Sequence, residues 1–320
     1  MDTQDTKIYY SIVVPVFNEQ EVLEEFYKRL FVVVEKLSES YEIVFVNDGS
    51  EDESLDIMKQ LQNRNSKIKI LDFSRNFGHQ IAITAGMDYS NGRAVIIIDA
   101  DLQDPPEVIS NFVEKWKQGY DIVYGVREQR QGESIFKKLS AKLFYRILRR
   151  MTNVDIPVDA GDFRLIDRKV VDVFSQQIRE KNRYIRGLTS WVGFKQVGVL
   201  YKRDKRFAGE TKYPLRKMVK LGLDGIISFS NIPLKIVSFF GFLAAGSSFL
   251  YAIYALAMRV FTNQTIPGWT SLVLAVVFLG GVQLLSLGLI GEYISRINDE
   301  SKGRPLYIIK KVFKKNEQGE

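Results

Sequence analysis

The chain of 320 residues contains no cysteine and only one histidine, His79. Disulfide bonds and thiolate metal sites are therefore excluded, and a metal site built from several histidines cannot form. Because His79 ends the run 75–79, we expect it to be a partly buried loop residue. The sequence has no Gly-rich dinucleotide fingerprint and no Walker lysine motif, so nothing supports a dinucleotide site or a P-loop. The first residues lack a basic segment followed by an apolar core, which predicts that there is no cleavable signal.

Two long apolar runs occur in the C-terminal third of the chain, at residues 232–258 and 269–291. The first carries a single charge, Lys235, and the second carries none. Each is long enough to cross the hydrocarbon core of a bilayer, about 30 Å thick, as a helix. We therefore expect two membrane spans. Small residues in both runs would allow the helices to approach each other or a second copy of the chain, which leaves a homo-oligomer open. These small residues are Gly241, Ala244, Ala245, Gly246, Gly280, Gly281 and Gly288.

The formal net charge of +7 is concentrated in a few segments, including the outer flanks of the two apolar runs. The linker between the runs, residues 259–268, offers only Arg259. The positive-inside rule therefore places both outer flanks in the cytoplasm and the linker outside. Basic patches can also bind nucleic acid, but these flank membrane spans, so we expect a lipid bilayer as partner and no nucleic acid. The flanking residues are Lys212, Arg216, Lys217, Lys220, Arg296, Lys302, Arg304, Lys310, Lys311, Lys314 and Lys315.

Ahead of the spans, apolar runs alternate with amphipathic stretches. This alternation predicts an α/β fold in which a parallel-type sheet is connected by crossover helices. We expect strands at 9–17, 41–46, 68–73, 94–98 and 121–126, and helices at 19–37, 52–62 and 80–89. Beyond residue 126 the pattern becomes mixed.

Polar residues follow the first four predicted strands, in the segments 15–19, 47–50, 74–76 and 99–101. The carboxyl ends of neighbouring parallel strands meet at one edge of a sheet, where open α/β folds bind ligands. Helix capping could explain single clusters, because Asn18 with Glu21, and Ser50 with Glu53, have capping-box spacing. Four clusters at one edge favour a ligand-binding crevice.

The stretch 94–106, AVIIIDADLQDPP, is the most informative of these segments. Its apolar run fits a strand buried on both faces, and it ends in Asp99 and Asp101. On an extended backbone, residues two apart project in the same direction. Hard cations such as Mg²⁺ choose carboxylate oxygens and share them with substrate phosphates. The alternative is turn chemistry after a strand, which Asp and Pro also favour.

Four motifs now support a resemblance to a known family: VVPVFNE at 13–19, VNDGS at 46–50, DADLQDPP at 99–106 and GDFRL at 161–165. They resemble those of family 2 glycosyltransferases with a GT-A fold. With two C-terminal membrane helices, the whole chain resembles the polyprenyl-phosphate glycosyltransferases related to dolichol-phosphate mannose synthase. It is most similar to the bacterial branch that loads glucose onto undecaprenyl phosphate.

The resemblance implies a binding site for a UDP-sugar donor. Asp99 and Asp101 would lie at the sugar diphosphate, with Mg²⁺ or Mn²⁺ held by Asp101 together with Asp99. In this family a basic segment ahead of the first membrane helix folds over the donor, and residues 202–213 match it. Positive charge for membrane topology explains Lys212 equally well. The donor-binding residues implied are Pro15, Phe17, Glu19, Asp48, Ser74, Asp99, Asp101, Gln103, Arg206 and Lys212.

The acceptor implied is a polyprenyl phosphate. Residues 135–151 form a basic amphipathic pattern suited to the headgroup region of a bilayer, although a surface helix packed on the body would look the same. Arg127, Arg130 and Lys137 could reach a lipid phosphate at its approach. Asp162 is the first candidate for orienting or deprotonating that phosphate, and Asp159 is the second. Asp162 departs from the archaeal and eukaryotic mannose synthases, where we expect a small residue.

The resemblance, together with the two membrane spans, thus implies an inverting, metal-dependent hexosyltransferase of the bacterial inner membrane. We expect a cytoplasmic catalytic domain at 1–210, a juxtamembrane segment at 211–231, two membrane helices at 232–293 and a basic cytoplasmic tail at 294–320. Mannose or a modified sugar could replace glucose, and a non-catalytic scaffold that kept the fold is a further alternative. A processive polysaccharide synthase is disfavoured because the Gln-x-x-Arg-Trp motif is absent: Ser190, not arginine, precedes Trp191.

Overall fold

The computed structural model describes residues 8–128, 160–204, 230, 232–262 and 268–314. It divides into two compact units, one made of residues 1–149, 154–219 and 304–320, and one made of 150–153 and 220–303. Each unit is described by itself. Several sequence predictions lie outside the described residues: the helix at 135–151, Arg130, Lys137, Asp159, Arg206 and Lys212.

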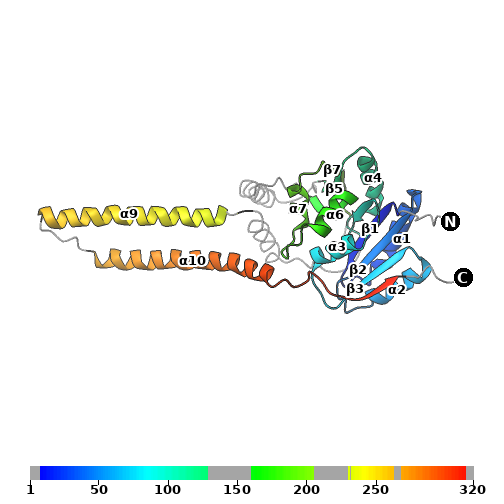
Figure 1. Ribbon diagram of the computed structural model, residues 1–320, viewed down its shortest axis with the longest axis horizontal. Helices are drawn as coiled ribbons and strands as arrows, with labels where there is room; N and C mark the ends of the chain where they lie inside the picture. Colours follow the sequence, from blue (N-terminus) through cyan, green and yellow to red (C-terminus); the bar gives the residue numbers. More distant parts are fainter. Residues whose placement is uncertain (1–7, 129–159, 205–229, 231, 263–267, 315–320) are drawn as a thin grey trace. The chain divides into compact units, whose positions relative to one another are not determined.

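The first unit is built on an eight-stranded sheet in the order β7-β5-β6-β4-β1-β2-β3-β8 (Figure 1). In its centre, β1 pairs in parallel with β2 and β4, and β2 pairs in parallel with β3. Every residue of these four strands is buried, as expected for apolar runs covered on both faces. The prediction of a parallel sheet is therefore confirmed for the first four strands. The strands are β1 (Tyr10–Val16), β2 (Tyr41–Asn47), β3 (Ile68–Phe73), β4 (Ala94–Ile97), β5 (Ile122–Arg127), β6 (Ala160–Asp167), β7 (Gln196–Tyr201) and β8 (Ile309–Lys314).

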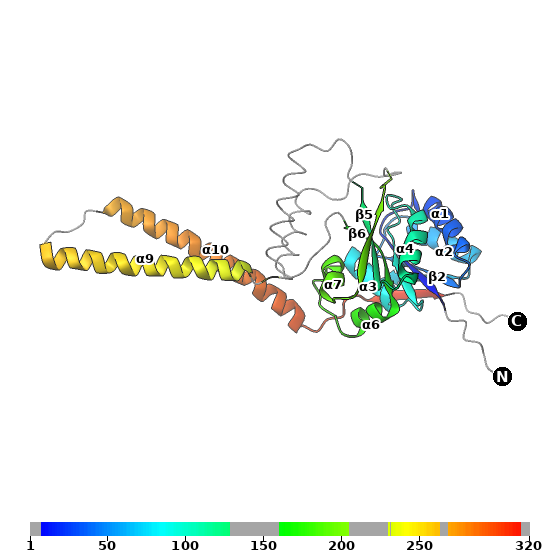
Figure 2. The same cartoon turned by 90° about the horizontal axis from the view of Figure 1, so that it is seen from above.

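Helices cover both faces of this sheet (Figure 2). One face carries α1 (Leu23–Lys36), α2 (Ser54–Arg64), the short 3-10 helix η1 (Pro106–Val108) and α4 (Ile109–Lys117). The other carries α3 (His79–Asp88), α6 (Arg168–Gln176) and α7 (Ile185–Trp191). The buried residues of α1 recur at helical spacing, which is why this segment packs as an amphipathic helix. They are Leu23, Phe26, Leu30, Val33 and Val34.

Beyond β4 the sheet becomes mixed, because β6 enters between β4 and β5 and runs antiparallel to both. In its register with β4, Ile97 lies opposite Arg164. Continuing this register by two residues brings Asp162 opposite Asp99, at the edge where β4 ends. β7 then adds in parallel to β5. The antiparallel insertion of β6 therefore carries a segment distant in sequence to the acid pair.

The C-terminal segment belongs to the sheet. We expected 294–320 to be a basic tail, but Ile309–Lys314 forms β8 and pairs antiparallel with β3. The Gln62 side-chain amide donates to the carbonyl oxygen of Phe313 at 2.8 Å, and the Phe313 ring packs against the core. The hydroxyl of Tyr307 donates to Asp88 at 2.8 Å, and its ring stacks on Phe73. These contacts tie the end of the chain to the first unit.

The second unit contains α9 (Ile232–Thr262) and α10 (Trp269–Ser301), which pack side by side. Within them, Ile232–Ala255 and Ala275–Ser301 are long and apolar enough to cross a membrane, by length and composition. Large apolar side chains of both helices are exposed, for example Phe242 and Leu285. The two predicted spans coincide with these helices, but α10 continues ten residues past the predicted end at 291.

Candidate active site

The loops after β1 and β2 are bound to each other at the edge of the sheet. The backbone N–H of Asn18 donates to Ser50 Oγ at 3.1 Å, and Asn18 Oδ1 accepts from the N–H of Glu51 at 2.9 Å. Within the described residues, neither α1 nor α2 has a side-chain cap. The capping interpretation of Asn18 and Ser50 is therefore wrong, because both side chains join loops instead.

Asp48 follows β2 and holds the loop that follows β3. Its carboxylate is buried and accepts from the backbone N–H groups of Phe77 at 2.7 Å and Gly78 at 3.0 Å. Burial raises the pKa of Asp48, and the two backbone hydrogen bonds oppose this rise. Gly49 has a φ of +70°, and a Cβ there would lie 2.6 Å from the Arg75 carbonyl carbon. The two loops are thus in close contact, with Asp48 as their link.

The other predicted donor-binding residues on these strands differ in their exposure. Pro15 is buried inside β1, whereas Phe17, just past its end, is 39% exposed and open to a ligand. Glu19 is partly exposed, and Ser74 is exposed, with its N–H donating to the carbonyl of Ile308 at 3.0 Å. Of these residues, Phe17 and Ser74 are thus exposed at the sheet edge, whereas Pro15 lies within the strand.

The acid pair follows β4, at the same edge. Asp101 Oδ1 accepts from the N–H of Gln103 at 3.1 Å, and the chain turns at Ala100. The extended geometry expected across the pair is therefore absent, since β4 ends at Ile97 and Asp101 lies in a turn. Asp99 Oδ1 is buried without a hydrogen-bond partner among the described residues. Burial raises the pKa of Asp99 to about 6.

These two carboxylates fit a divalent cation that a substrate completes. The described residues contain no group of three or more His, Cys, Asp or Glu side chains that could hold a metal by themselves. Mg²⁺ is usually bound by one or two protein carboxylates together with substrate phosphates. Asp99, whose buried Oδ1 accepts no hydrogen bond among the described residues, and Asp101 two residues on supply this kind of donor set.

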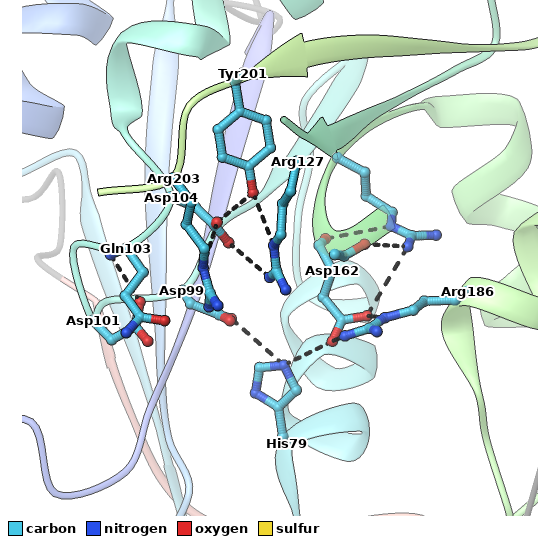
Figure 3. Close-up of polar contacts among 12 residues, drawn as sticks. His79, Asp99, Asp101, Gln103, Asp104, Arg127, Asp162, Arg186, Tyr201 and Arg203 are labelled. Carbon is cyan, nitrogen blue, oxygen red and sulfur yellow. Dashed lines mark hydrogen bonds and ion pairs between the residues drawn. The ribbon is translucent and has the colours of Figure 1, made fainter. Parts of the chain in front are cut away.

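Asp162, at the start of β6, lies at the centre of a group of donors (Figure 3). The guanidinium of Arg186 in α7 contacts both of its oxygens, at 2.9 Å from Nε and 3.0 Å from Nη2. The amide of Gln80 donates to Oδ2 at 3.2 Å. Buried Arg164 donates to the carbonyls of Gly161 and Asp162 and so fixes the backbone there. Burial alone would raise the pKa of Asp162, but Arg186 and His79 hold it well below its ordinary range.

His79 is a site residue that the sequence did not reveal. It is the first residue of α3, not a loop residue, and its Nε2 lies 3.5 Å from Asp99 Oδ1 and 3.3 Å from Asp162 Oδ2. Burial favours the neutral ring, but the two carboxylates outweigh it and raise the pKa of His79 to about 9. His79 therefore bridges the acid pair and Asp162, as Figure 3 shows. The short distances from His79 to the two carboxylates result from the packing of α3 on the sheet, and no sequence motif indicates that packing.

A second cluster surrounds Asp104, beside the acid pair. Its buried carboxylate accepts from the Tyr201 hydroxyl and lies 3.8 Å from Arg127 and 3.6 Å from Arg203. Arg127, predicted as an acceptor-phosphate residue, thus approaches Asp104 from the end of β5. Tyr201, Arg186 and Gln80 were not expected at the site, whereas Arg203 lies in the segment 202–213 expected to fold over the donor and Arg164 lies in the GDFRL motif. Arginine and tyrosine without a motif carry no signal that separates them from surface residues.

The sheet, its parallel centre and the acid pair at the end of β4 define a GT-A fold of the glycosyltransferase class. The chain belongs to the Glycosyl transferase family 2, whose model matches residues 11–174, and the GtrB C-terminal hairpin model matches residues 232–297. The resemblance found in the sequence is thereby confirmed.

Similar proteins cover nearly the whole chain. The uncharacterized glycosyltransferase YkcC of Bacillus subtilis is 56% identical over 306 residues, which are 96% of this chain and 94% of that protein. The prophage bactoprenol glucosyl transferase homolog of Escherichia coli is 41% identical over 95% of this chain and 99% of that protein. The SfII prophage-derived bactoprenol glucosyl transferase of Shigella flexneri is also 41% identical, over 96% of this chain and 99% of that protein. The similarity therefore extends through the catalytic unit and the helical hairpin alike.

Proposed function

We propose that this protein transfers glucose from UDP-glucose to the phosphate of a polyprenol, as in undecaprenyl (bactoprenyl) phosphate. The observation that carries the proposal is the acid pair at the end of β4 in a chain that continues into the GtrB hairpin. The two relatives named as bactoprenol glucosyl transferases are each 41% identical to this chain, over 95% and 96% of its length. A donor crevice and an apolar hairpin in one chain suit a soluble sugar donor and a lipid acceptor.

The donor lies across the ends of β1, β2 and β4 in this proposal. Phe17 packs against the base, and Asp48 keeps the 77–78 loop in place beneath the nucleoside. Asp99 and Asp101 would hold Mg²⁺ or Mn²⁺, which when bound would supply positive charge against the charge that builds on departing UDP. Gln103 fixes the turn of Asp101 through its backbone N–H. From outside the described residues, Arg206 and Lys212 remain proposed donor ligands.

The reaction is a direct displacement. An oxygen of the acceptor phosphate bonds to the anomeric carbon of glucose while the bond from that carbon to the UDP β-phosphate oxygen breaks. The electron pair leaves with UDP, and the configuration at the anomeric carbon inverts. A phosphate monoester dianion needs no base to remove a proton, so the main task of the protein is to hold two anionic substrates in line.

The connectivity of the hairpin supports a two-pass membrane topology. The chain leaves the first unit before α9 and returns to it after α10, as β8 of the same sheet. A hairpin that begins and ends at one folded unit enters and leaves the bilayer on one side. Because the basic residues lie on these two flanks, the positive-inside rule makes that side the cytoplasm. The catalytic unit and both termini are thus proposed to be cytoplasmic.

The test is glycolipid formation by the purified full chain. Undecaprenyl phosphate in detergent or nanodiscs is mixed with radiolabelled UDP-glucose, other UDP-sugars or GDP-mannose, with Mg²⁺, Mn²⁺ or EDTA, and label is counted in the lipid phase. We expect label from UDP-glucose with a cation and none with EDTA. Label from GDP-mannose alone would show that the donor is GDP-mannose and not UDP-glucose. No label from any sugar would refute the proposal and support a non-catalytic scaffold.

Asp101→Asn tests the metal site in the same assay. Losing one carboxylate ligand should abolish turnover and weaken cation-dependent UDP binding at least tenfold. Asp56→Asn is the matched control, because Asp56 is an exposed carboxylate of α2 whose partner is Lys59. Normal turnover in Asp101→Asn would remove this residue from the site.

A further inference from the structure

The strand order divides the sheet edge that carries the site residues into two halves, on either side of β4. β1, β2 and β3 lie on one side and carry the loops of Phe17 and Asp48, which the proposed function assigns to the nucleoside. β6 and β5 lie on the other side, and α7 packs against β6. The half beyond β4 is therefore left for the acceptor. Figure 3 shows this half with Arg127, Asp162 and Arg186 next to one another.

Arg186 is held in place on that side by Asp162. Both carboxylate oxygens are engaged by the guanidinium, through Nε and Nη2, and the carboxylate is buried. A side-on pair of this geometry uses two of the guanidinium donors and leaves the remaining Nη1 edge for another anion. The Arg186 side chain is 25% exposed, whereas that of Asp162 is 5% exposed. The arginine, rather than the aspartate, is thus the member of the pair that a ligand can reach.

Arg127 approaches the same place from β5. Its Nη2 lies 2.8 Å from where a Cβ of residue 161 would be, so the guanidinium rests on Gly161, the neighbour of Asp162. Its nearest carboxylate, Asp104, is 3.8 Å away, which is a loose ion pair. Burial is the largest single influence on the pKa of Arg127 and lowers it, as does the nearby charge of Arg186, but Asp104 and Tyr201 together raise the pKa above its ordinary value. Two guanidinium groups therefore flank residues 161–162.

Asp162 itself is badly placed for removing a proton. Besides Arg186, its Oδ2 accepts from Gln80 and lies 3.3 Å from His79, so both oxygens already have donors. Its pKa lies well below the ordinary range, which makes the carboxylate a weak base. Of the two roles considered from the sequence, orienting and deprotonating, this geometry favours orienting.

We propose that Arg186 and Arg127 together bind the acceptor phosphate, and that Asp162 is a positioning residue that holds Arg186. This inference rests on the proposed function and identifies its acceptor group as a phosphate monoester dianion. Each of two guanidinium groups can donate two charge-assisted hydrogen bonds to such a group. One phosphate oxygen then remains to attack the sugar. A free polyprenol lacks the group that this pair of arginines recognises.

Arg186→Gln is the first test, in nanodiscs with undecaprenyl phosphate and UDP-glucose. We expect the KM for undecaprenyl phosphate to rise at least tenfold, while the dissociation constant of UDP with Mn²⁺ stays within twofold. Arg186→Lys keeps the positive charge but not the paired donors of the planar guanidinium, and it should give a smaller rise in the KM for undecaprenyl phosphate. Arg179→Gln is the matched control, since Arg179 binds both oxygens of Asp88 elsewhere in the unit.

Gly161→Ala tests the role of Arg127 without removing a charged group. The new methyl group meets only the far end of the Arg127 side chain, so the fold should tolerate it while the guanidinium is displaced. We expect unchanged thermal stability and a higher KM for undecaprenyl phosphate. An unchanged acceptor KM in both Gly161→Ala and Arg186→Gln would overturn the inference.

Asp162→Asn separates a positioning residue from a base. As a positioning residue it should raise the acceptor KM and leave the shape of the pH profile of kcat unchanged. As a base it would lower kcat by a thousandfold or more at unchanged KM and remove the acidic limb of that profile. A wild-type enzyme that makes no glycolipid would contradict the proposed function instead, so the two failures are distinguishable.

Discussion

Gly49→Ala should damage the donor half of the site through the backbone. A residue with a side chain at φ +70° costs about 1–2 kcal/mol. In addition, the new Cβ would lie 2.6 Å from the carbonyl carbon of Arg75 and from the nitrogen of Asn76, where ordinary contacts begin near 3.4 Å. Overpacking of this kind costs about 1–3 kcal/mol, because backbone atoms must move. The expected total loss in the free energy of unfolding is about 2–5 kcal/mol.

The displaced backbone leads directly to Phe77 and Gly78, whose N–H groups bind Asp48. We therefore expect UDP affinity to fall at least tenfold, measured by titration calorimetry alongside thermal unfolding. Gly193→Ala is the matched control: its φ of +72° is nearly the same, but no atom lies within 4 Å of the added Cβ. It should carry only the conformational penalty and bind UDP normally. Equal effects of the two substitutions on stability and UDP affinity would refute the reasoning.

Two further predictions concern stability. In the metal-free protein, His79 has a pKa raised to about 9, so its stabilising contribution is complete below the unfolded value of about 6.5 and is lost as pH rises through 9. The difference in free energy of unfolding between wild type and His79→Gln should therefore shrink, by up to about 3 kcal/mol, between pH 6.5 and 9.5 in EDTA; a difference independent of pH would contradict this. Tyr307→Phe removes the hydroxyl donor to Asp88 but keeps the stack on Phe73. Thermal unfolding should show a loss of about 1–2 kcal/mol in the free energy of unfolding, with unchanged UDP binding. No loss would mean that the hydroxyl is bound as favourably by water in the unfolded chain as by Asp88 in the folded protein.

The central part of the fold was predictable because one physical signal dominates there. Four apolar runs separated by amphipathic stretches leave few alternatives to a parallel sheet with crossover helices. The acid pair was predictable for the same reason, since it directly follows the uninterrupted apolar run 94–98. β8 was missed because its sequence, IKKVFK, carries three lysines, and its exposed edge position in the sheet tolerates them.

The donor residues that follow strands were easier to predict than the acceptor residues. A polar cluster directly after an apolar run marks its own place at the sheet edge, as with Asp48 and Asp99. Arg186 has no such marker, because α7 is short and its position depends on the link from Gln80 to the backbone N–H of Ile185. His79 likewise acquires its two carboxylate neighbours only when α3 packs against the sheet.

The antiparallel insertion of β6 is the step that joins the two halves of the site. A fifth parallel strand next to β4 would present its carboxyl end beside Asp99, and the segment 160–162 would lie at the opposite edge. Because β6 runs the other way, its first residues meet the last of β4, and Asp162 comes opposite Asp99 in the continued register. Two carboxylates this close repel each other unless a cation lies between them, and His79 lies between them here. The charge on His79 thus allows the donor half and the acceptor half to be held together in the absence of substrate.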